Sequence, residues 1–388
     1  MAFRAVEPRG GVPGPAHPRC YVPPMLTPSR RRWFWAVVTG FGLLVAACGS
    51  TGSSASSSTT PADQGPPVLH PAAERRPVSD PVPPGDVRMH PTSAFATGVP
   101  VAKGNFADPF LLIVDDDEVY AYATNVTGAN IPVLVSKSST AAESLGDALP
   151  QLPKWTSPGT VWAPSVYPRG DGKYVLYYNS VFGITGHQCV GVAVGDNPAG
   201  PFVDDSEKPL VCPISLGGAI DPSMIVVDGD PWLIYKSDGN CCDLPTGIWS
   251  VRLSDDLLDT QGEPTQLITT DQAWEGSVVE APELVEVGGQ LHLFYSGNDW
   301  NTSDYAIGHA SCTTVSGPCT KTSREPLLAS GASVAGPGGE TLVVSGDAAV
   351  IGYHGWTPGR VGAPGGERQL YAGVVTFSGD QVQLVPYG

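Results

Sequence analysis

The chain has 388 residues with 21 basic and 38 acidic side chains, so its formal net charge is −17 at pH 7. Such an acidic balance argues against nucleic acids and anionic polymers as partners, and it leaves neutral or cationic ligands open. Residues 1–47 hold six arginines and one glutamate, and the remaining 15 basic and 37 acidic residues give a net charge of −22.

The N-terminal part of the sequence is laid out like an export signal. Arg30–Arg32 precede the apolar run WFWAVVTGFGLLVAAC, which is too short for a comfortable membrane span. Its last four residues, Val45–Cys48, resemble the lipobox of bacterial lipoproteins, and this resemblance implies that Cys48 becomes the lipidated first residue. An ordinary signal or anchor segment with an incidental cysteine is the alternative, and translation from Met25 would leave a more compact basic region. We therefore expect an exported protein that is either held by a lipid anchor on the outward face of the cell membrane or secreted.

Residues 48–100 are rich in Ser, Thr, Pro, Gly and Ala and contain almost no aromatic residues. Such a segment cannot bury enough apolar surface to offset its chain entropy, which predicts a disordered tether. Residues 101–388 are then the folded part, and their number suits one large all-β domain.

Five segments of this folded part share one form: a small or acidic residue, a proline, an apolar strand, a Gly/Asp turn and an aromatic-rich strand. The shared prolines are 55, 58, 60 and 55 residues apart, at Pro109, Pro164, Pro222, Pro282 and Pro337. Four short strands per unit at this period, with no credible long helix, predict a five-bladed β-propeller. A β-sandwich is the alternative, but it would not give five evenly spaced units.

Six cysteines follow the predicted tether, an even number that indicates disulfides in an exported chain. Cys312–Cys319 would close a short loop, and Cys189–Cys212 would link neighbouring strands. Cys241 and Cys242 would then form a vicinal pair, unless the connectivity differs. Metal binding is a weaker alternative, because no histidine cluster accompanies the cysteines.

Proline lacks a donor for the strand ladder and is tolerated at a strand's first residue, so the prolines should mark where the innermost strands meet the central funnel. Beside them lie Asp108, Asp221 and Glu280, which we expect at equivalent positions facing one axis. A single Asp before proline is as readily a turn residue. Three acids crowded at one axis oppose folding, however, and such crowding is tolerated mainly where chemistry needs it.

The segments ADPF, VWAPSV, AIDPSM, EAPEL and GYHGW, in this order and spacing, resemble the family 43 glycoside hydrolases, a group of five-bladed propeller arabinofuranosidases, arabinanases and β-xylosidases. The resemblance runs from about Lys103 to the C-terminus. It implies an inverting glycosidase that acts on arabinofuranosyl linkages, with Asp108 as general base, Asp221 tuning pKa and orientation, and Glu280 as general acid. Inversion places acid and base about 6.5–9.5 Å apart to admit a water. Burial and the Asp221 charge should raise the pKa of Glu280 so that it carries a proton.

Two further residues are candidates on the same basis. Trp162 could present its apolar face to a sugar ring, and core filling is the alternative. His354, in GYHGW, matches a family histidine near the axis that often helps to bind a cation or water, and calcium is the ion that the resemblance implies, although the chemistry itself needs no cofactor. One departure is Gly339, which stands where the family often has histidine.

Other acids are expected to play no catalytic part. Asp115–Glu118 reads as a solvated hairpin turn, and Glu283 lies just inside the strand after Pro282. A long insert such as Asn125–Trp155 could shape the funnel into an open groove or a closed pocket, which would decide between endo and exo action.

The expected partner is an oligo- or polysaccharide, and the protein is expected to be a monomer that touches the membrane only through its anchor. A β-xylosidase or a galactan-directed enzyme is the nearest rival. Retaining β-fructosidases share the fold and acids, but typically have Asn and Cys where this chain has Ala107 and Ala281. A non-catalytic glycan-binding propeller would be favoured by loss of one of the three acids, and all three are present.

Overall fold

The computed structural model describes residues 100–102, 104–115, 118–137 and 142–387, and most regular structure in these ranges is β-strand. Residues 1–99, with the predicted leader, Cys48 and nearly all of the predicted tether, lie outside the described residues. Among the described residues, no helix is long and apolar enough to cross a membrane.

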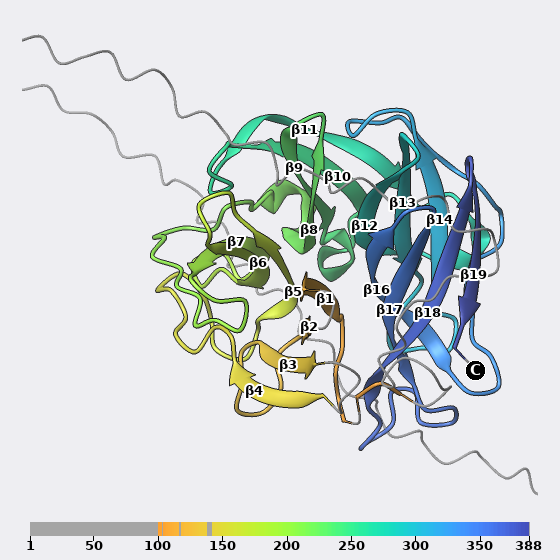
Figure 1. Ribbon diagram of the computed structural model, residues 1–388, viewed down its shortest axis with the longest axis horizontal. Coiled ribbons are helices and arrows are strands. Elements are labelled where there is room, and N and C mark those ends of the chain that lie inside the picture. Colours follow the sequence, from red (N-terminus) through yellow and green to blue (C-terminus); the bar gives the residue numbers. More distant parts are fainter. Residues whose placement is uncertain (1–99, 103, 116–117, 138–141, 388) are drawn as a thin grey trace, which may run out of the picture. The chain divides into compact units, whose positions relative to one another are not determined.

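Five antiparallel sheets surround one axis, which confirms the predicted five-bladed β-propeller. Figure 1 shows the innermost strands β1, β5, β8, β12 and β16 near the centre, with β4, β11 and β19 at the periphery. From the axis outward, the blades are β1 (Phe110–Asp115), β2 (Glu118–Tyr122), β3 (Pro132–Lys137) and β4 (Glu143–Asp147); β5 (Trp162–Pro168), β6 (Tyr174–Val181) and β7 (Gln188–Gly195); β8 (Ala219–Val227), β9 (Asp230–Ser237), β10 (Gly247–Leu253) and β11 (Thr260–Thr269); β12 (Val279–Val287), β13 (Gln290–Gly297), β14 (Ala306–Cys312) and β15 (Cys319–Lys321); and β16 (Ala335–Ser345), β17 (Ala348–Trp356), β18 (Arg368–Ser378) and β19 (Gln381–Pro386). Three short 3-10 helices complete the described elements: η1 (Ile214–Leu216), η2 (Gly239–Cys242) and η3 (Ala273–Glu275).

Two details differ from the predicted organisation. Blade 2 has three strands rather than four, and single bridges from Val203 and Val211 to β7 take the place of an outer strand. The supposed insert Asn125–Trp155 consists largely of β3, β4 and their connections, so it is the outer half of blade 1. Short, irregular outer strands carry little hydrophobic alternation, which is the signal on which the prediction depended.

The first and last blades are joined by main-chain hydrogen bonds. The N–H of Val101 donates to the Leu370 carbonyl at 2.7 Å, and the N–H of Phe106 donates to the Arg368 carbonyl at 2.7 Å. Both acceptors belong to β18 in blade 5, so the segment that leads into blade 1 pairs with blade 5 and closes the ring.

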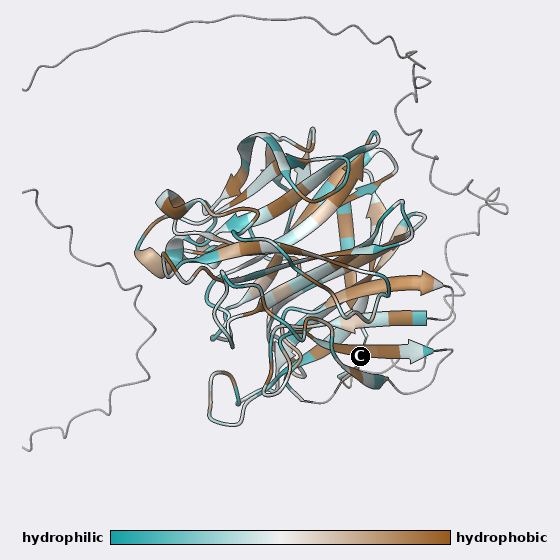
Figure 2. Cartoon of the chain, turned by 90° about the vertical axis from the view of Figure 1, so that its left-hand side faces the viewer, coloured by the Kyte–Doolittle hydropathy of each residue, from teal (hydrophilic) through white to brown (hydrophobic). Residues whose placement is uncertain are grey.

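The core consists of five apolar clusters, each between two neighbouring blades. Adjacent residues of one strand belong to different clusters. In β6, Tyr177 packs toward blade 3 and Tyr178 toward blade 1. In β13, Phe294 packs toward blade 5 and Tyr295 toward blade 3. Side chains alternate across a strand, so a middle strand buried on both faces must be apolar at consecutive positions. Figure 2 shows brown hydrophobic segments along the strands. Burial of each large side chain stabilises the fold by about 1.5–3 kcal/mol.

The three predicted disulfides are all present. Cys189–Cys212 ties β7 to the segment after Val211, and Cys312–Cys319 joins β14 to β15. Cys241 and Cys242 form the vicinal pair within η2.

Candidate active site

The entries to the five innermost strands converge on the propeller axis. The residue before each proline has a left-handed φ, between 42° and 55°, at Asp108, Ala163, Asp221, Ala281 and Gly336. In β5, β8, β12 and β16 the strand register shifts at this point, as in a β-bulge. Residues from all five blades line one cavity of about 40 Å³ on the axis. A left-handed conformation costs about 1–3 kcal/mol for a residue other than glycine, and such strain clusters at functional sites.

The three predicted acids do not occupy the same position of this repeated turn. Asp108 and Asp221 directly precede the proline and line the axial cavity, whereas Glu280 lies one residue earlier, before Ala281. The expectation of three equivalent positions was therefore wrong for Glu280, whose counterpart in blade 2 is Trp162. The bulge still brings the acids together, because Ala281 donates its N–H to Asp221 Oδ2 at 2.9 Å.

Asp108 is surrounded by donors. Thr124 donates its hydroxyl to Oδ2 at 2.5 Å, and Arg368 donates to Oδ1 at 3.1 Å. His354 Nδ1 lies 3.2 Å from Oδ1. His354 Nδ1 also accepts the main-chain N–H of Asp108 at 3.1 Å. Burial by itself would raise the pKa of Asp108, but the Arg368 charge, then the nearby His354 side chain and the hydrogen bond from Thr124, hold it well below its ordinary value. Asp108 is therefore ionised throughout the physiological pH range.

Asp221 carries a proton at neutral pH. Burial, and next the charge of Glu280, raise the pKa of Asp221 to about 8. Glu280 itself is buried, and its two oxygens accept different hydrogen bonds: Oε1 from the Tyr305 hydroxyl at 2.8 Å and Oε2 from Lys236 Nζ at 2.7 Å. The site thus combines an ionised carboxylate, Asp108, with a protonated carboxyl group, Asp221, beside the buried Glu280.

Lys236 was missed by the sequence reasoning. It is 1% exposed in β9 and lies between Glu280 and Asp238, whose Oδ1 is 3.5 Å from Nζ. Burial by itself lowers the pKa of Lys236, but the charges of Glu280 and Asp238 raise it above its ordinary value, so the ammonium stays charged. The sequence does contain a signal for Lys236, because it is a single cation within the apolar run PWLIYKS. A single charge within an apolar strand is also what singled out Glu280.

Trp162 is 37% exposed, so it is not a core side chain. Its neighbour Ala163 donates its N–H to the Thr124 hydroxyl at 3.0 Å, and that hydroxyl in turn donates to Asp108. The main chain next to Trp162 is therefore linked to Asp108 through Thr124, and the exposed indole remains a candidate sugar platform.

A second exposed tryptophan was also missed. Trp300 is 43% exposed and stacks on Trp356 with 6.1 Å between ring centroids. The Arg368 guanidinium lies 4.5 Å from the centroid of the Trp300 ring and also contacts Asp108. Aromatic faces suit the apolar faces of sugar rings, so Trp300 is a further candidate platform.

Gly339 explains the departure from the family pattern. Its φ is +62°, and a Cβ there would lie 2.5 Å from His354 Nδ1 and 3.0 Å from Asp108 Oδ1. Only glycine leaves room for these two side chains to meet.

His354 offers a poor ligand set for calcium. Burial lowers the pKa of His354, and its Nε2 has no hydrogen-bond partner within the described part of the chain. In the same ranges, no three His, Cys, Asp or Glu side chains are placed to hold a metal, whereas Ca²⁺ takes six to eight oxygen ligands. The residues present do not fit a protein-ligated calcium.

Two more carboxyl groups line the axial cavity and are neutral. Burial raises the pKa of Glu283 well above its ordinary value, with a further contribution from Glu340. Burial raises the pKa of Glu340 to about 8, and its Oε2 accepts a 2.6 Å hydrogen bond from Ser296.

Known proteins with similar sequence or structure point to one family. The model of glycosyl hydrolases family 43 matches residues 97–382. The chain is 27% identical over 239 residues to the probable arabinan endo-1,5-alpha-L-arabinosidase C of Aspergillus niger, covering 56% of this chain and 72% of that protein. It is 26% identical over 228 residues to the extracellular endo-alpha-(1->5)-L-arabinanase 2 of Bacillus subtilis, covering 53% of this chain and 45% of that protein. The crystal structure of a thermostable family-43 glycoside hydrolase superposes with a TM-score of 0.66 at 26% identity, over 75% of this chain and 95% of that chain.

Proposed function

The chain belongs to glycosyl hydrolase family 43 and is therefore a glycoside hydrolase, and from this premise we propose that it cleaves arabinofuranosyl linkages in polysaccharides with inversion at the anomeric carbon. The resemblance seen in the motifs is thereby confirmed at the level of the family. Two relatives named as arabinan-cleaving enzymes support the choice of sugar. The observation that carries the mechanism is that ionised Asp108 and buried Glu280, whose two oxygens are held by Lys236 and Tyr305, converge on one axis.

In the proposed reaction, Glu280 donates a proton to the glycosidic oxygen while Asp108 removes a proton from the attacking water. The bond from the anomeric carbon to the leaving oxygen breaks, and a bond to the water oxygen forms on the opposite face. Glu280 becomes negative in this step, and the Lys236 ammonium 2.7 Å away stabilises that charge. Asp221 positions the residue after Glu280 by accepting the N–H of Ala281.

The direct test replaces each catalytic acid by its amide. We expect Glu280→Gln and Asp108→Asn each to remove hydrolysis of aryl α-L-arabinofuranosides while the thermal transition is retained. Glu286→Gln is the matched control, because Glu286 lies on the same strand, β12, but is exposed. A Glu280→Gln variant with wild-type rates would contradict the acid assignment. Proton NMR of the first-formed sugar tests inversion, and a retained anomer would refute the proposed mechanism.

A β-xylosidase or galactan-directed activity in the same family remains the alternative, and a panel of glycans assayed with the folded domain separates these from arabinan. Full binding without turnover on every glycan of the panel would instead favour a glycan-binding propeller.

We also propose that the protein is exported and anchored as a monomer through a lipid on Cys48. The relative in Bacillus subtilis is named as extracellular, which supports export. Replacement of Cys48 by alanine should move the protein from the membrane fraction to the medium if the anchor exists.

A further inference from the structure

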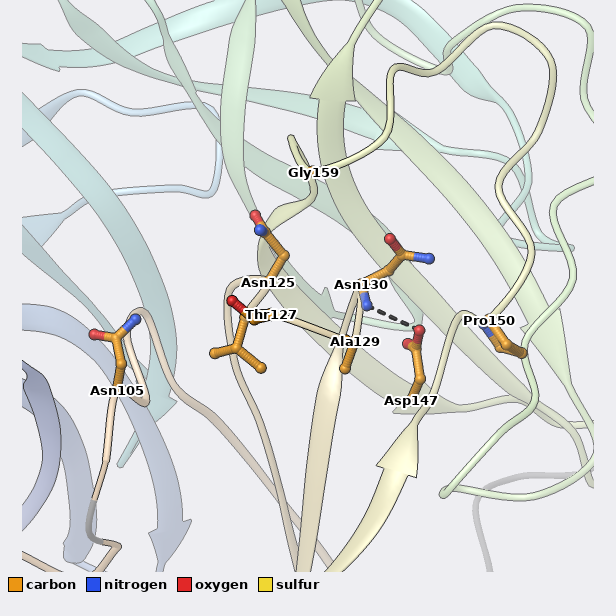
Figure 3. A pocket seen from close by; sticks show the side chains of 10 residues that line it. Asn105, Asn125, Thr127, Ala129, Asn130, Asp147, Pro150 and Gly159 are labelled. Carbon is orange, nitrogen blue, oxygen red and sulfur yellow. Dashed lines mark hydrogen bonds between the residues drawn. The ribbon is translucent and has the colours of Figure 1, made fainter.

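The segment before β1, the loops of blade 1 and the segment before β5 form a large polar cavity. It has a volume of about 1,030 Å³, at the upper end of the range of about 300–1,000 Å³ typical of small-molecule sites. We call it the amide cavity, and Figure 3 shows side chains that line it. The ones used below are Asn105, Asn125, Thr127, Asn130 and Asp147.

The amide cavity adjoins the general base. Asn125 directly follows Thr124, whose hydroxyl binds Asp108. On the other side, Asn105 accepts the N–H of Arg368 at 3.1 Å, and the guanidinium of Arg368 contacts Asp108. Glu280 belongs to blade 4, across the axis from blades 1 and 2. The cavity therefore opens beside Asp108 and away from the proton donor.

The wall of the cavity is held rigidly. Asp147 accepts the N–H groups of Asn130, Ile131 and Leu149 at 2.8–3.0 Å, and the Asn130 amide donates to the Leu149 carbonyl at 2.8 Å. Figure 3 shows the first of these bonds between Asn130 and Asp147. Because the loop is already ordered, a ligand would bind without having to immobilise it.

The groups that remain for a ligand are neutral. No other described residue forms a hydrogen bond with the side-chain amide of Asn125 or the hydroxyl of Thr127. Among the described lining residues there is no lysine, arginine or aromatic ring, and the one charge, on Asp147, is negative. Amides and hydroxyls match the donors and acceptors of sugar hydroxyls, whereas an acidic sugar would find no cation there.

We propose that the amide cavity binds the neutral glycan chain on the glycone side of the cleaved bond, so that the enzyme cuts inside its polysaccharide rather than releasing terminal residues. The inference rests on the proposed function. The leaving sugar must lie next to Glu280, which donates its proton, and the attacked ring lies between Glu280 and Asp108. Sugar units that occupy space beyond Asp108 are therefore joined to the attacked ring and not to the leaving group.

The test compares a linear arabino-oligosaccharide with an aryl α-L-arabinofuranoside, which is too short to enter the cavity. In the double variant Asn125→Ala/Thr127→Ala, the ratio of kcat/KM for the oligosaccharide to that for the aryl glycoside should fall about ten-fold, since a neutral hydrogen bond accounts for roughly three- to ten-fold. Gln383→Ala is the control, because Gln383 is exposed on the outer strand β19, and its ratio should match the wild type. Early products of the wild-type protein on linear arabinan should be oligosaccharides.

Two results would overturn the inference alone: an unchanged ratio in the double variant, or arabinose as the sole early product while arabinan and the aryl glycoside are both cleaved. If the wild-type protein cleaves neither substrate, the proposed function fails together with the inference. Thermal melting of each variant shows whether a loss of activity reflects unfolding.

Discussion

Replacing Glu340 by glutamine removes a carboxyl group that the fold keeps neutral on the propeller axis. Its pKa is 4.5 in the absence of the fold and about 8 within it, because it is buried. Below pH 4.5 this carboxyl is protonated in both the folded and the unfolded protein, so its ionisation takes nothing from the stability of the fold there. As the pH rises toward 8, the unfolded protein ionises the group and the folded protein does not, and the free energy of unfolding falls. Linkage gives a destabilisation of about 1 kcal/mol at pH 5, about 2 at pH 6, about 3 at pH 7 and about 4 at pH 8. This is a large share of a typical stability of about 5–15 kcal/mol.

Glutamine keeps the shape of the side chain and its bond to Ser296 but cannot ionise, so Glu340→Gln should lack this slope. The assay is chemical denaturation of the wild-type and variant proteins between pH 5 and pH 8. The variant should gain about 3 to 4 kcal/mol relative to the wild type over this interval. Glu340 also contributes to the raised pKa of Glu283, so the difference between the two proteins includes this smaller effect together with that of Glu340 itself. Parallel free energies of unfolding across the interval would show that Glu340 titrates normally and would refute the reasoning.

Three further predictions concern the site. Lys236→Met should shift the alkaline limb of the pH profile of kcat/KM upward by about 1 unit or more, because a cation no longer opposes protonation of Asp221; an unmoved limb would exclude that role. Trp300→Ala should raise KM for arabino-oligosaccharides several-fold with a smaller change in kcat, as expected for a stacking platform worth about 1 kcal/mol, and steady-state kinetics would reveal an unchanged KM if the ring does not bind sugar. Dialysis against EDTA should leave turnover and melting temperature unchanged, because His354 lacks the oxygen ligands that calcium needs; a loss that added Ca²⁺ restores would contradict this.

The architecture could be predicted because each blade repeats the same local chemistry. A proline excluded from the strand ladder, a Gly/Asp turn and a strand apolar on both faces are readable from neighbouring residues alone. The outer strands could not be predicted as well. Blade 2 lacks a regular fourth strand, and β4 is largely exposed, so its side chains carry no periodic signal.

The site was predictable to the extent that it is built on the repeat. Asp108, Asp221 and Glu280 were located by their prolines, whereas the partners that tune them come from distant positions. Lys236 meets Glu280 across 44 residues and Arg368 meets Asp108 across 260, and no local pattern encodes such contacts. The amide cavity could not be predicted from the sequence for the same reason, because loops before, within and after blade 1 form it together.

The left-handed turn before each proline has a consequence for how such a scaffold can diversify. Each blade places two adjacent residues at the axis, the residue before the proline and the one preceding it, and their Cα atoms are about 3.8 Å apart. This step is comparable to the difference in carboxyl separation between retaining enzymes, at about 5–5.5 Å, and inverting enzymes, at about 6.5–9.5 Å. Shifting an acid by one residue, as between Ala281 and Glu280, therefore changes spacing by an amount relevant to stereochemistry without altering a single strand. Alanine at Ala163 and Ala281 leaves these two positions open to substitution, whereas a Cβ at Gly336 would lie 2.5 Å from the carbonyl oxygen of Thr302.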